Sequence, residues 1–279
     1  MITIQFQNKD EMDFLYFLLK KSKQTMIQVQ KSYNGLVIQI DNEKREQGLL
    51  IIHKHLKQLV MNKKRVVWCK RVIQEKFFFK DEEEQTQIID ILFSILDGKR
   101  KDLPIDVNHE QEERKIDQAL KEVLSSNRTF SFDAFVMFRL RPYLENLAPY
   151  IETAIDEYKM EQDYQAFIHY LRNFLSGRKP QMKKVYIVHD DGFTFFNEQK
   201  QMMKRSELNK RIDRKLLSDH PVYVDSITIA PLISIAPEKI YLFTDHPEFG
   251  IIQTLKNIFE EKIYIQSLEA ISNYSLTNN

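Results

Sequence analysis

Two short clusters near the C-terminus carry residue types that could bind a metal ion or serve in acid–base chemistry. His189, Asp190 and Asp191 follow the apolar run KVYIV, and Asp245 and His246 follow the run KIYLF. Imidazole nitrogens and carboxylate oxygens are common ligands of divalent cations. Polar residues at the carboxyl ends of parallel strands lie on the edge of the sheet where α/β proteins place ligands. A small-ligand, metal or enzyme site is therefore one interpretation, provided that the two strand ends meet.

Local structure gives both clusters a simpler explanation. Asp190-Asp191-Gly192 is an efficient hairpin turn. Asp245-His246-Pro247 is a good helix start, because Asp or His can cap a helix and proline suits its first position. We expect a turn and a strand-to-helix junction here, with the helix beginning within two residues of Pro247. No metal site and no cofactor is predicted.

Other candidate groups fit ordinary structural roles. His53 and His55 are two residues apart on a predicted helix and point away from each other, unlike the four-residue spacing of helical zinc sites. Cys69 has basic neighbours that could lower a thiol pKa, but it also falls in line with apolar residues, so we expect a buried, inert thiol. The six glycines are too widely spaced for a glycine-rich phosphate loop, and the chain has no G-x-S-x-G, C-x-x-C or H-E-x-x-H.

Composition limits the class of protein and its partners. The formal net charge is +1, from 41 Lys plus Arg and 40 Asp plus Glu, which does not predict a general nucleic-acid or membrane-surface binder. A single cysteine excludes an intramolecular disulfide and favours a reducing compartment. The early apolar run FLYFLL is far shorter than the roughly 20 residues that span a bilayer. We expect a soluble cytoplasmic protein without a membrane span.

Two stretches are locally basic despite the balanced total. One is MNKKRVVWCKR, residues 61 to 71, where Trp68 could stack on a base. The other spans residues 200 to 215. Solvated helix faces explain both stretches more simply, because acidic runs offset them. Weak nucleic-acid binding through residues 200–215 is therefore an alternative and not the favoured interpretation. The basic residues of that stretch are Lys204, Arg205, Lys210, Arg211, Arg214 and Lys215.

The elements that would position these residues predict an α+β fold. Residues 1–96 read as an N-terminal β-α-β-β module followed by helices, with a hairpin turn ending at Gly35. Residues 97–109 read as a linker, and residues 110–178 as an all-helical region. Residues 179–279 read as a C-terminal α/β module. That module contains a βαβ unit, in which KIYLF and KIYIQ are parallel strands joined by a helix.

The stretch from 143 to 175 carries two apolar stripes that do not share one helix face. On an ideal helix the second stripe is rotated by roughly 140° from the first. Either the chain turns near residues 159–163, or one helix packs against two different partners. We favour the turn. Pro142 and Pro149 also predict breaks or kinks upstream, because an interior proline destabilises a helix.

Three segments carry a family resemblance: FVMFRLRPYLENL (135–147), AIDEYKMEQDYQAFIHYLRNFL (154–175) and ISIAPEKIYLF (233–243). With these segments the sequence resembles the YtxC family of endospore-forming bacteria. The first hundred residues match by layout, and Pro142 and Pro149 depart from the family's helix-friendly pattern. The polar residues of the helical motif favour an internal network of ion pairs and hydrogen bonds over a ligand site. They are Arg139, Glu157, Glu161, Tyr164 and Arg172.

The resemblance implies a process, sporulation, and no particular reaction. The favoured function is a non-catalytic sporulation factor that acts through contacts with a protein partner. The alternatives are an enzyme or small-ligand binder at the strand-end clusters, and the weak nucleic-acid binder described above.

Overall fold

The computed structural model describes residues 1–22, 26–100, 103, 109–126, 129–213, 227–274 and 276. The chain divides into two compact units, Met1–Met160 and Glu161–Asn279. Both units combine helices with a mixed sheet, so the predicted α+β class is confirmed. In the part of the chain that is described, no helix is long and apolar enough to cross a membrane.

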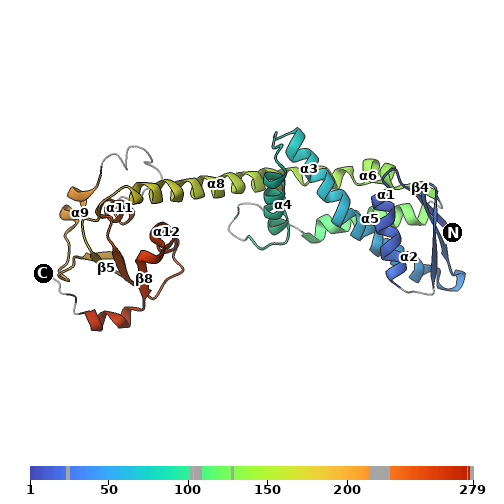
Figure 1. Ribbon diagram of the computed structural model, residues 1–279. Helices are drawn as coiled ribbons and strands as arrows, with labels where there is room; N and C mark the ends of the chain where they lie inside the picture. The colour runs from blue at the N-terminus through green and yellow to red at the C-terminus, as the bar shows by residue number, and fades with distance from the viewer. Residues whose placement is uncertain are drawn as a thin grey trace. The chain divides into compact units, whose positions relative to one another are not determined.

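The sheet of unit 1 has the strand order β2-β3-β1-β4. The predicted β-α-β-β start is present: β1 (Ile2–Gln5), α1 (Lys9–Lys21), β2 (Ile27–Ser32) and β3 (Gly35–Ile40). The sheet lies near the N-terminus, beside the helix α1 (Figure 1). Gly35 pairs with Ser32 across the hairpin, and a Cβ at this position would collide with the carbonyl oxygen of Ile4. The short strand β4 (Thr129–Ser131) was not predicted and pairs parallel to β1.

Helices supply the rest of unit 1. Asn8 caps α1 and Asp81 caps α4, each by accepting hydrogen bonds from two backbone N–H groups of the first turn. The helical segments are η1 (Asn42–Lys44), α2 (Arg45–Leu59), the π-helix η2 (Val60–Lys64), α3 (Arg65–Glu75), α4 (Glu82–Leu96), α5 (His109–Ser126), α6 (Phe132–Arg139), α7 (Arg141–Glu145) and the start of α8 (Ala148–Ser176).

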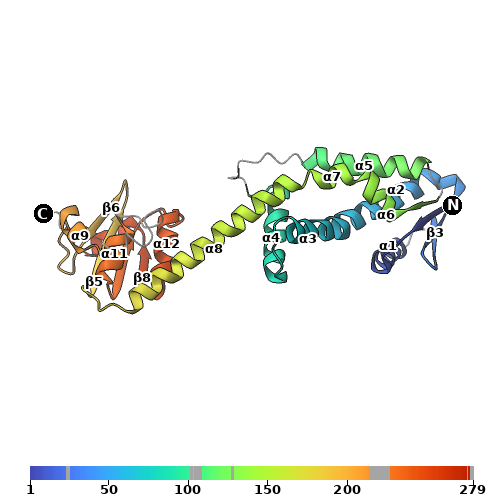
Figure 2. The same cartoon turned by 90° about the horizontal axis from the view of Figure 1, so that it is seen from above.

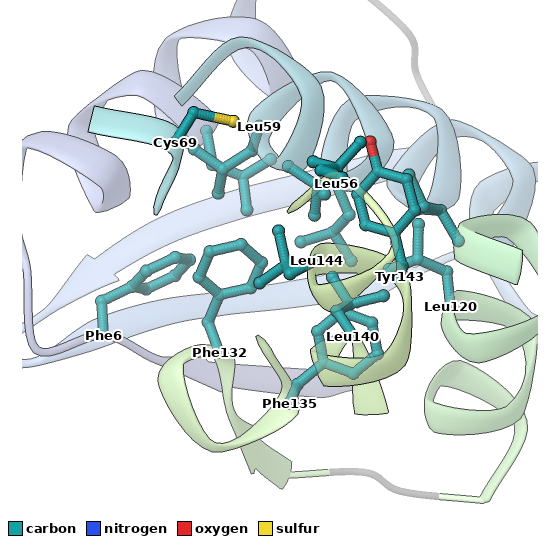
Figure 3. Close-up of a cluster of buried hydrophobic side chains, with 14 of the residues drawn as sticks. Phe6, Leu56, Leu59, Cys69, Leu120, Phe132, Phe135, Leu140, Tyr143 and Leu144 are labelled. Carbon is teal, nitrogen blue, oxygen red and sulfur yellow. The ribbon is translucent and has the colours of Figure 1, made fainter. Parts of the chain in front are cut away.

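The core of unit 1 lies between the sheet and these helices (Figure 3). The rings of Phe6, which follows β1, and Phe132, which begins α6, lie 5.2 Å apart. Leu56 and Leu59 of α2 are fully buried in the same core, as is Cys69 of α3. The core therefore fixes α2, α3 and α6 relative to the sheet.

Helix α8 runs without interruption from Ala148 to Ser176 (Figure 2), so the turn favoured near residues 159–163 is wrong. Its first apolar stripe, which includes Ile151 and Ile155, belongs to the core of unit 1. Its second stripe, which includes Phe167 and Leu171, belongs to the core of unit 2. The alternative interpretation is therefore correct, and each stripe is buried in a different core. The prolines do mark breaks, because Pro142 and Pro149 are the second residues of α7 and α8.

Unit 2 is built on a sheet with the order β6-β5-β7-β8. The predicted hairpin is confirmed, with β5 (Lys184–His189) antiparallel to β6 (Phe193–Phe196). The predicted βαβ unit is also present: β7 (Lys239–Phe243) lies parallel to β8 (Ile263–Gln266), and α12 (Gly250–Phe259) connects them. The remaining elements are α9 (Arg205–Arg211), α11 (Ile229–Ile235), η3 (Glu260–Lys262) and η4 (Leu268–Tyr274).

The two faces of this sheet have different coverings. Alternate residues of β5, Val185 and Ile187, join the core that includes α11 and α12. The residue between them, Tyr186, faces a smaller cluster formed with η4. Tyr186, Tyr241 and Tyr264 pair in register across three strands. Among the described elements, α11 and α12 pack into the same core, so these two helices do not form the crevice that arises where crossover connections change faces.

Candidate functional site

Unit 1 contains an open depression between α3, α6 and α7, with a volume of about 520 Å³. A second hollow beside the start of α1 shares five of its lining residues, so the two are continuous. We refer to the combined depression as the α3–α6 groove. Its first hollow is lined by Gln7, Lys64, Val67, Trp68, Arg71, Asp133, Val136, Met137, Arg141, Leu144 and Glu145.

The spacing of the lining residues explains why helices form the walls. Lys64, Val67, Trp68 and Arg71 are spaced i, i+3, i+4 and i+7, which places them on one face of η2 and α3. The facing wall comes from α6 and α7. Helix α6 begins at Phe132, where Ser131 caps it by accepting a hydrogen bond from the N–H of Ala134.

The walls expose large apolar side chains. Met137 on α6 is 66% exposed and Val67 on α3 is 50% exposed. Trp68, which lines the same hollow, is half-buried. Apolar side chains gathered at a depression with a few polar groups are a feature of surfaces that bind other molecules. Trp, Met and Arg are also the residue types enriched at protein–protein interfaces.

A cluster of three charged side chains lies where the two hollows of the groove meet. Lys64 Nζ is 2.9 Å from Glu11 Oε2 and 3.0 Å from Asp133 Oδ1. Asp133 Oδ2 also accepts a hydrogen bond of 2.8 Å from the backbone N–H of Gln7. The cluster therefore connects α1, the π-helix and α6, three elements that are far apart in the sequence.

Burial and pairing set the protonation of this cluster. Burial raises the pKa of Glu11, and the nearby Lys64 only partly offsets the effect. Burial alone would raise the pKa of Asp133, but the N–H of Gln7 and the ammonium of Lys64 bring it below its ordinary value. The two carboxylates outweigh burial at Lys64 and raise its pKa. A lysine that stays protonated cannot act as a nucleophile or base, so the cluster is a fixed ion-pair group.

Sequence reasoning did not identify this cluster, although one signal was present. Glu11 lies four residues before Leu15, on the buried face of an amphipathic helix. A carboxylate in an apolar stripe needs a partner, because an unpaired buried charge is costly. The identity of the partners, Lys64 and Asp133, could not be inferred from spacing.

Comparison with known proteins identifies the family of the chain. The profile of the YtxC-like family matches residues 50–264, which includes α3, α6 and α7. The chain belongs to the YtxC-like family. It is 40% identical over 201 residues to the uncharacterized protein YtxC of Bacillus subtilis (strain 168), and the match covers 72% of this chain and 71% of that relative. No solved structure matches the chain.

The polar residues of the YtxC motif make separate contacts in the two units. In unit 1, Arg139 lies 3.6 Å from Glu122, and Glu157 pairs with Arg100 at 2.8 Å. Glu161 lies exposed on the part of α8 that belongs to unit 2. The structure thus distributes these side chains along α6 and α8.

Two further motif residues connect α8 to the end of α12 in unit 2. The Tyr164 hydroxyl accepts a hydrogen bond of 2.9 Å from the Asn257 amide. Arg172 Nε donates to the Asn257 carbonyl at 2.8 Å, and its guanidinium pairs with Glu260 at 2.8 Å. A cation at a helix C-terminus satisfies carbonyl groups that have no partner within the helix. These contacts give Arg172 a role in ending α12.

The strand-end clusters of unit 2 partly meet. His189 Nδ1 lies 3.0 Å from the hydroxyl of Thr244, which also accepts a hydrogen bond from the N–H of His246. The rings of His189 and His246 lie 5.4 Å and 5.5 Å from the ring of Phe249. His189 is buried and His246 is exposed. The two imidazoles therefore share only the ring of Phe249, because Thr244 contacts the imidazole of His189 and the backbone of His246.

The three aspartates of these clusters have other surroundings. Asp245 accepts a hydrogen bond of 3.0 Å from the N–H of Leu268. Asp190 and Asp191 lie in the hairpin turn, at the edge of a different hollow of about 630 Å³ that also contains Lys204 and Arg205. Within the described residues, no group of three His, Cys, Asp or Glu side chains is arranged to hold a metal ion.

The junction after β7 is longer than predicted. Helix α12 begins at Gly250, three residues after Pro247, so the predicted limit of two residues is missed by one. The N–H of Phe249 donates to the carbonyl of His246 at 3.3 Å, which closes a turn with Pro247 in its second position. The fixed φ of proline suits that position as well as it suits a helix start.

The remaining candidates are the thiol of Cys69, the two histidines of α2 and the basic stretch at residues 200–215. Burial raises the pKa of the Cys69 thiol to about 12, despite the nearby Arg65. His53 contacts Asp117, and His55 contacts Gln58. In the basic stretch, Lys204 to Arg211 lie on or beside the short helix α9, whereas Arg214 and Lys215 fall outside the described residues.

Proposed function

We propose that this YtxC-family chain is a non-catalytic cytoplasmic protein that acts in sporulation by binding a protein partner through the α3–α6 groove. The observation that carries the proposal is the exposed apolar surface of Val67 and Met137 beside Trp68. Burying such side chains against a partner releases water and stabilises the complex. The resemblance to the YtxC family supports sporulation as the process.

Two features support a binding role over a chemical one. The most strongly buried charged groups beside the groove, Glu11 and Lys64, are paired and fixed. The thiol of Cys69 is buried and held protonated by its surroundings. A free buried thiol also suits the reducing cytoplasm.

A photo-crosslinking residue at position 137 tests the proposal in sporulating cells. The matched control carries the same residue at Leu50 on α2, which is 65% exposed and lies outside the groove. We expect a discrete protein adduct from position 137 that the control does not give. We also expect Val67→Asp, at an exposed position, to abolish the adduct and lower the yield of heat-resistant spores without lowering the melting temperature. Identical adducts from both positions would contradict the proposal.

A further inference from the structure

We infer that the partner occupies the α3–α6 groove as an amphipathic α-helix that places an acidic residue against Arg71. This inference rests on the proposed function and specifies the chemistry of the partner. The helical walls of the groove support a helical partner, and the pairing of its charged residues supports an acidic one. Trp68, which lines the groove, provides the means to test both.

The walls favour a helix over an extended segment. An extended peptide gains affinity by adding to the free edge of a sheet, and the edge strands of this sheet are β2 and β4. The groove is lined instead by side chains of α3, α6 and α7, together with the segment around Gln7 after β1. Ridges on two helices form a groove that accepts the ridge of a third helix.

The dimensions set the length of the bound helix. Lys64 and Arg71 are separated by seven residues, which corresponds to about 10 Å along a helix. A partner helix of two to three turns would match this wall with side chains at i, i+3 or i+4, and i+7. Its apolar stripe would contact Val67, Trp68 and Met137.

The charged residues of the groove indicate which charge the partner should carry. Lys64 is paired with two carboxylates, and Arg141 is paired with Glu145 at 2.7 Å. Arg71 is exposed and has no ion pair among the described residues of the chain. At the α1 end of the groove, the lining includes one further cation, Lys9, and one further anion, Asp10. Arg71 lines the same hollow as Val67, Trp68 and Met137, which Lys9 does not, so Arg71 is the cation available to a carboxylate beside the apolar stripe of the partner.

Trp68 makes the inference directly measurable, because it is the only tryptophan in the chain and it lines the groove. The probe is a displayed library of helices of about 15 residues, randomised on one face, beside a library of extended peptides of equal length. Both are selected against the full chain. We expect helices with an apolar stripe and an adjacent Asp or Glu to be enriched, and a selected helix to shift the Trp68 fluorescence saturably.

A charge exchange separates a specific contact from general attraction. Arg71→Glu should weaken binding of the selected acidic helix about tenfold or more, and replacing its acidic residue with lysine should restore binding. Arg45→Glu is the control, because Arg45 is exposed at the start of α2 and does not line the groove. It should leave binding within about twofold.

Several outcomes would overturn the inference. They are enrichment of basic helices, enrichment of extended peptides only, or a helix whose affinity is the same for Arg71→Glu and the wild type. If no helix is selected while position 137 still gives its adduct in cells, the helical partner is wrong and the proposed function stands. If both experiments fail, the groove is not a protein-binding site.

Discussion

The ammonium of Lys64 lies 2.9 Å from a carboxylate oxygen of Glu11, although 53 residues separate them in the chain. The Glu11 side chain is 6% exposed and the Lys64 side chain is 17% exposed. This oxygen of Glu11 has the charge contact but no well-directed hydrogen bond. The pair secures the first helix to the π-helix that begins the groove, so changes in its charge should affect the stability of unit 1.

Removing the cation should be strongly destabilising. Lys64→Met leaves Glu11 and Asp133 facing each other without a positive charge, and loss of one partner from a buried ion pair costs about 3–5 kcal/mol. Chemical denaturation followed through Trp68 fluorescence would measure the change. A Lys64→Met, Glu11→Gln double variant should regain part of the loss, whereas equal stability of both variants would argue against charge repulsion as the cause.

Removing the carboxylate charge of Glu11 should change how stability depends on pH. The pKa of Glu11 is raised by folding above its ordinary value of 4.5, so the folded state binds more protons than the unfolded state in that window. Ionisation of Glu11 therefore lowers the stability of the wild type as pH rises from about 4.5 to the raised pKa. Glu11→Gln should lack this loss, so the stability of the variant relative to the wild type should rise through the window and then level off. Denaturation curves across pH would test the slope.

Ionisation of Asp133 should have the opposite effect on stability to ionisation of Glu11. Its pKa is lowered by folding, so its stabilising contribution is present above its ordinary value of 3.8 and is lost as pH falls toward the lowered pKa. Asp133→Asn should lower stability at neutral pH, because the Lys64 contact loses its negative charge. The same substitution should flatten the acid limb of the stability curve. An unchanged acid limb would show that Asp133 does not titrate with folding.

The second stripe of α8 should be essential to unit 2. Phe167 is 5% exposed, and Phe167→Ala should lower the stability of unit 2 by about 3–5 kcal/mol, since it leaves a cavity in the core. Met160→Ala is the control, because Met160 is exposed on the same helix. Thermal melts of both variants would compare them, and similar melting temperatures would exclude the assigned burial of Phe167.

The histidines after β5 and β7 should differ in their importance. His189 is buried and lies within hydrogen-bond distance of Thr244, so His189→Ala should destabilise unit 2 by about 1–3 kcal/mol. His246 is exposed, and His246→Ala should have a modest effect. Divalent zinc or magnesium should not raise the melting temperature of the wild type. A saturable rise of several degrees that disappears in His246→Ala would instead reveal a metal site.

Local chemistry was sufficient to predict much of unit 2 and the start of unit 1. The Asp190-Asp191-Gly192 hairpin and the parallel pairing of β7 with β8 follow from turn residues and strand periodicity, which act over a few positions. The breaks before Pro142 and Pro149 follow from the missing N–H and fixed φ of proline. Burial of Cys69 followed from its apolar neighbours along α3.

Only the tertiary structure decided the features that depend on partners distant in the chain. The two stripes of α8 fit either a turn or one helix, and the choice depended on two separate cores being available to bury them. The periodicity of α1 showed a carboxylate on its buried face, but the position of Lys64 and Asp133 depended on how α1, the π-helix and α6 pack. The α3–α6 groove arises from the same packing. Sequence spacing determines which residues share a helix face, whereas packing of the faces determines which residues meet.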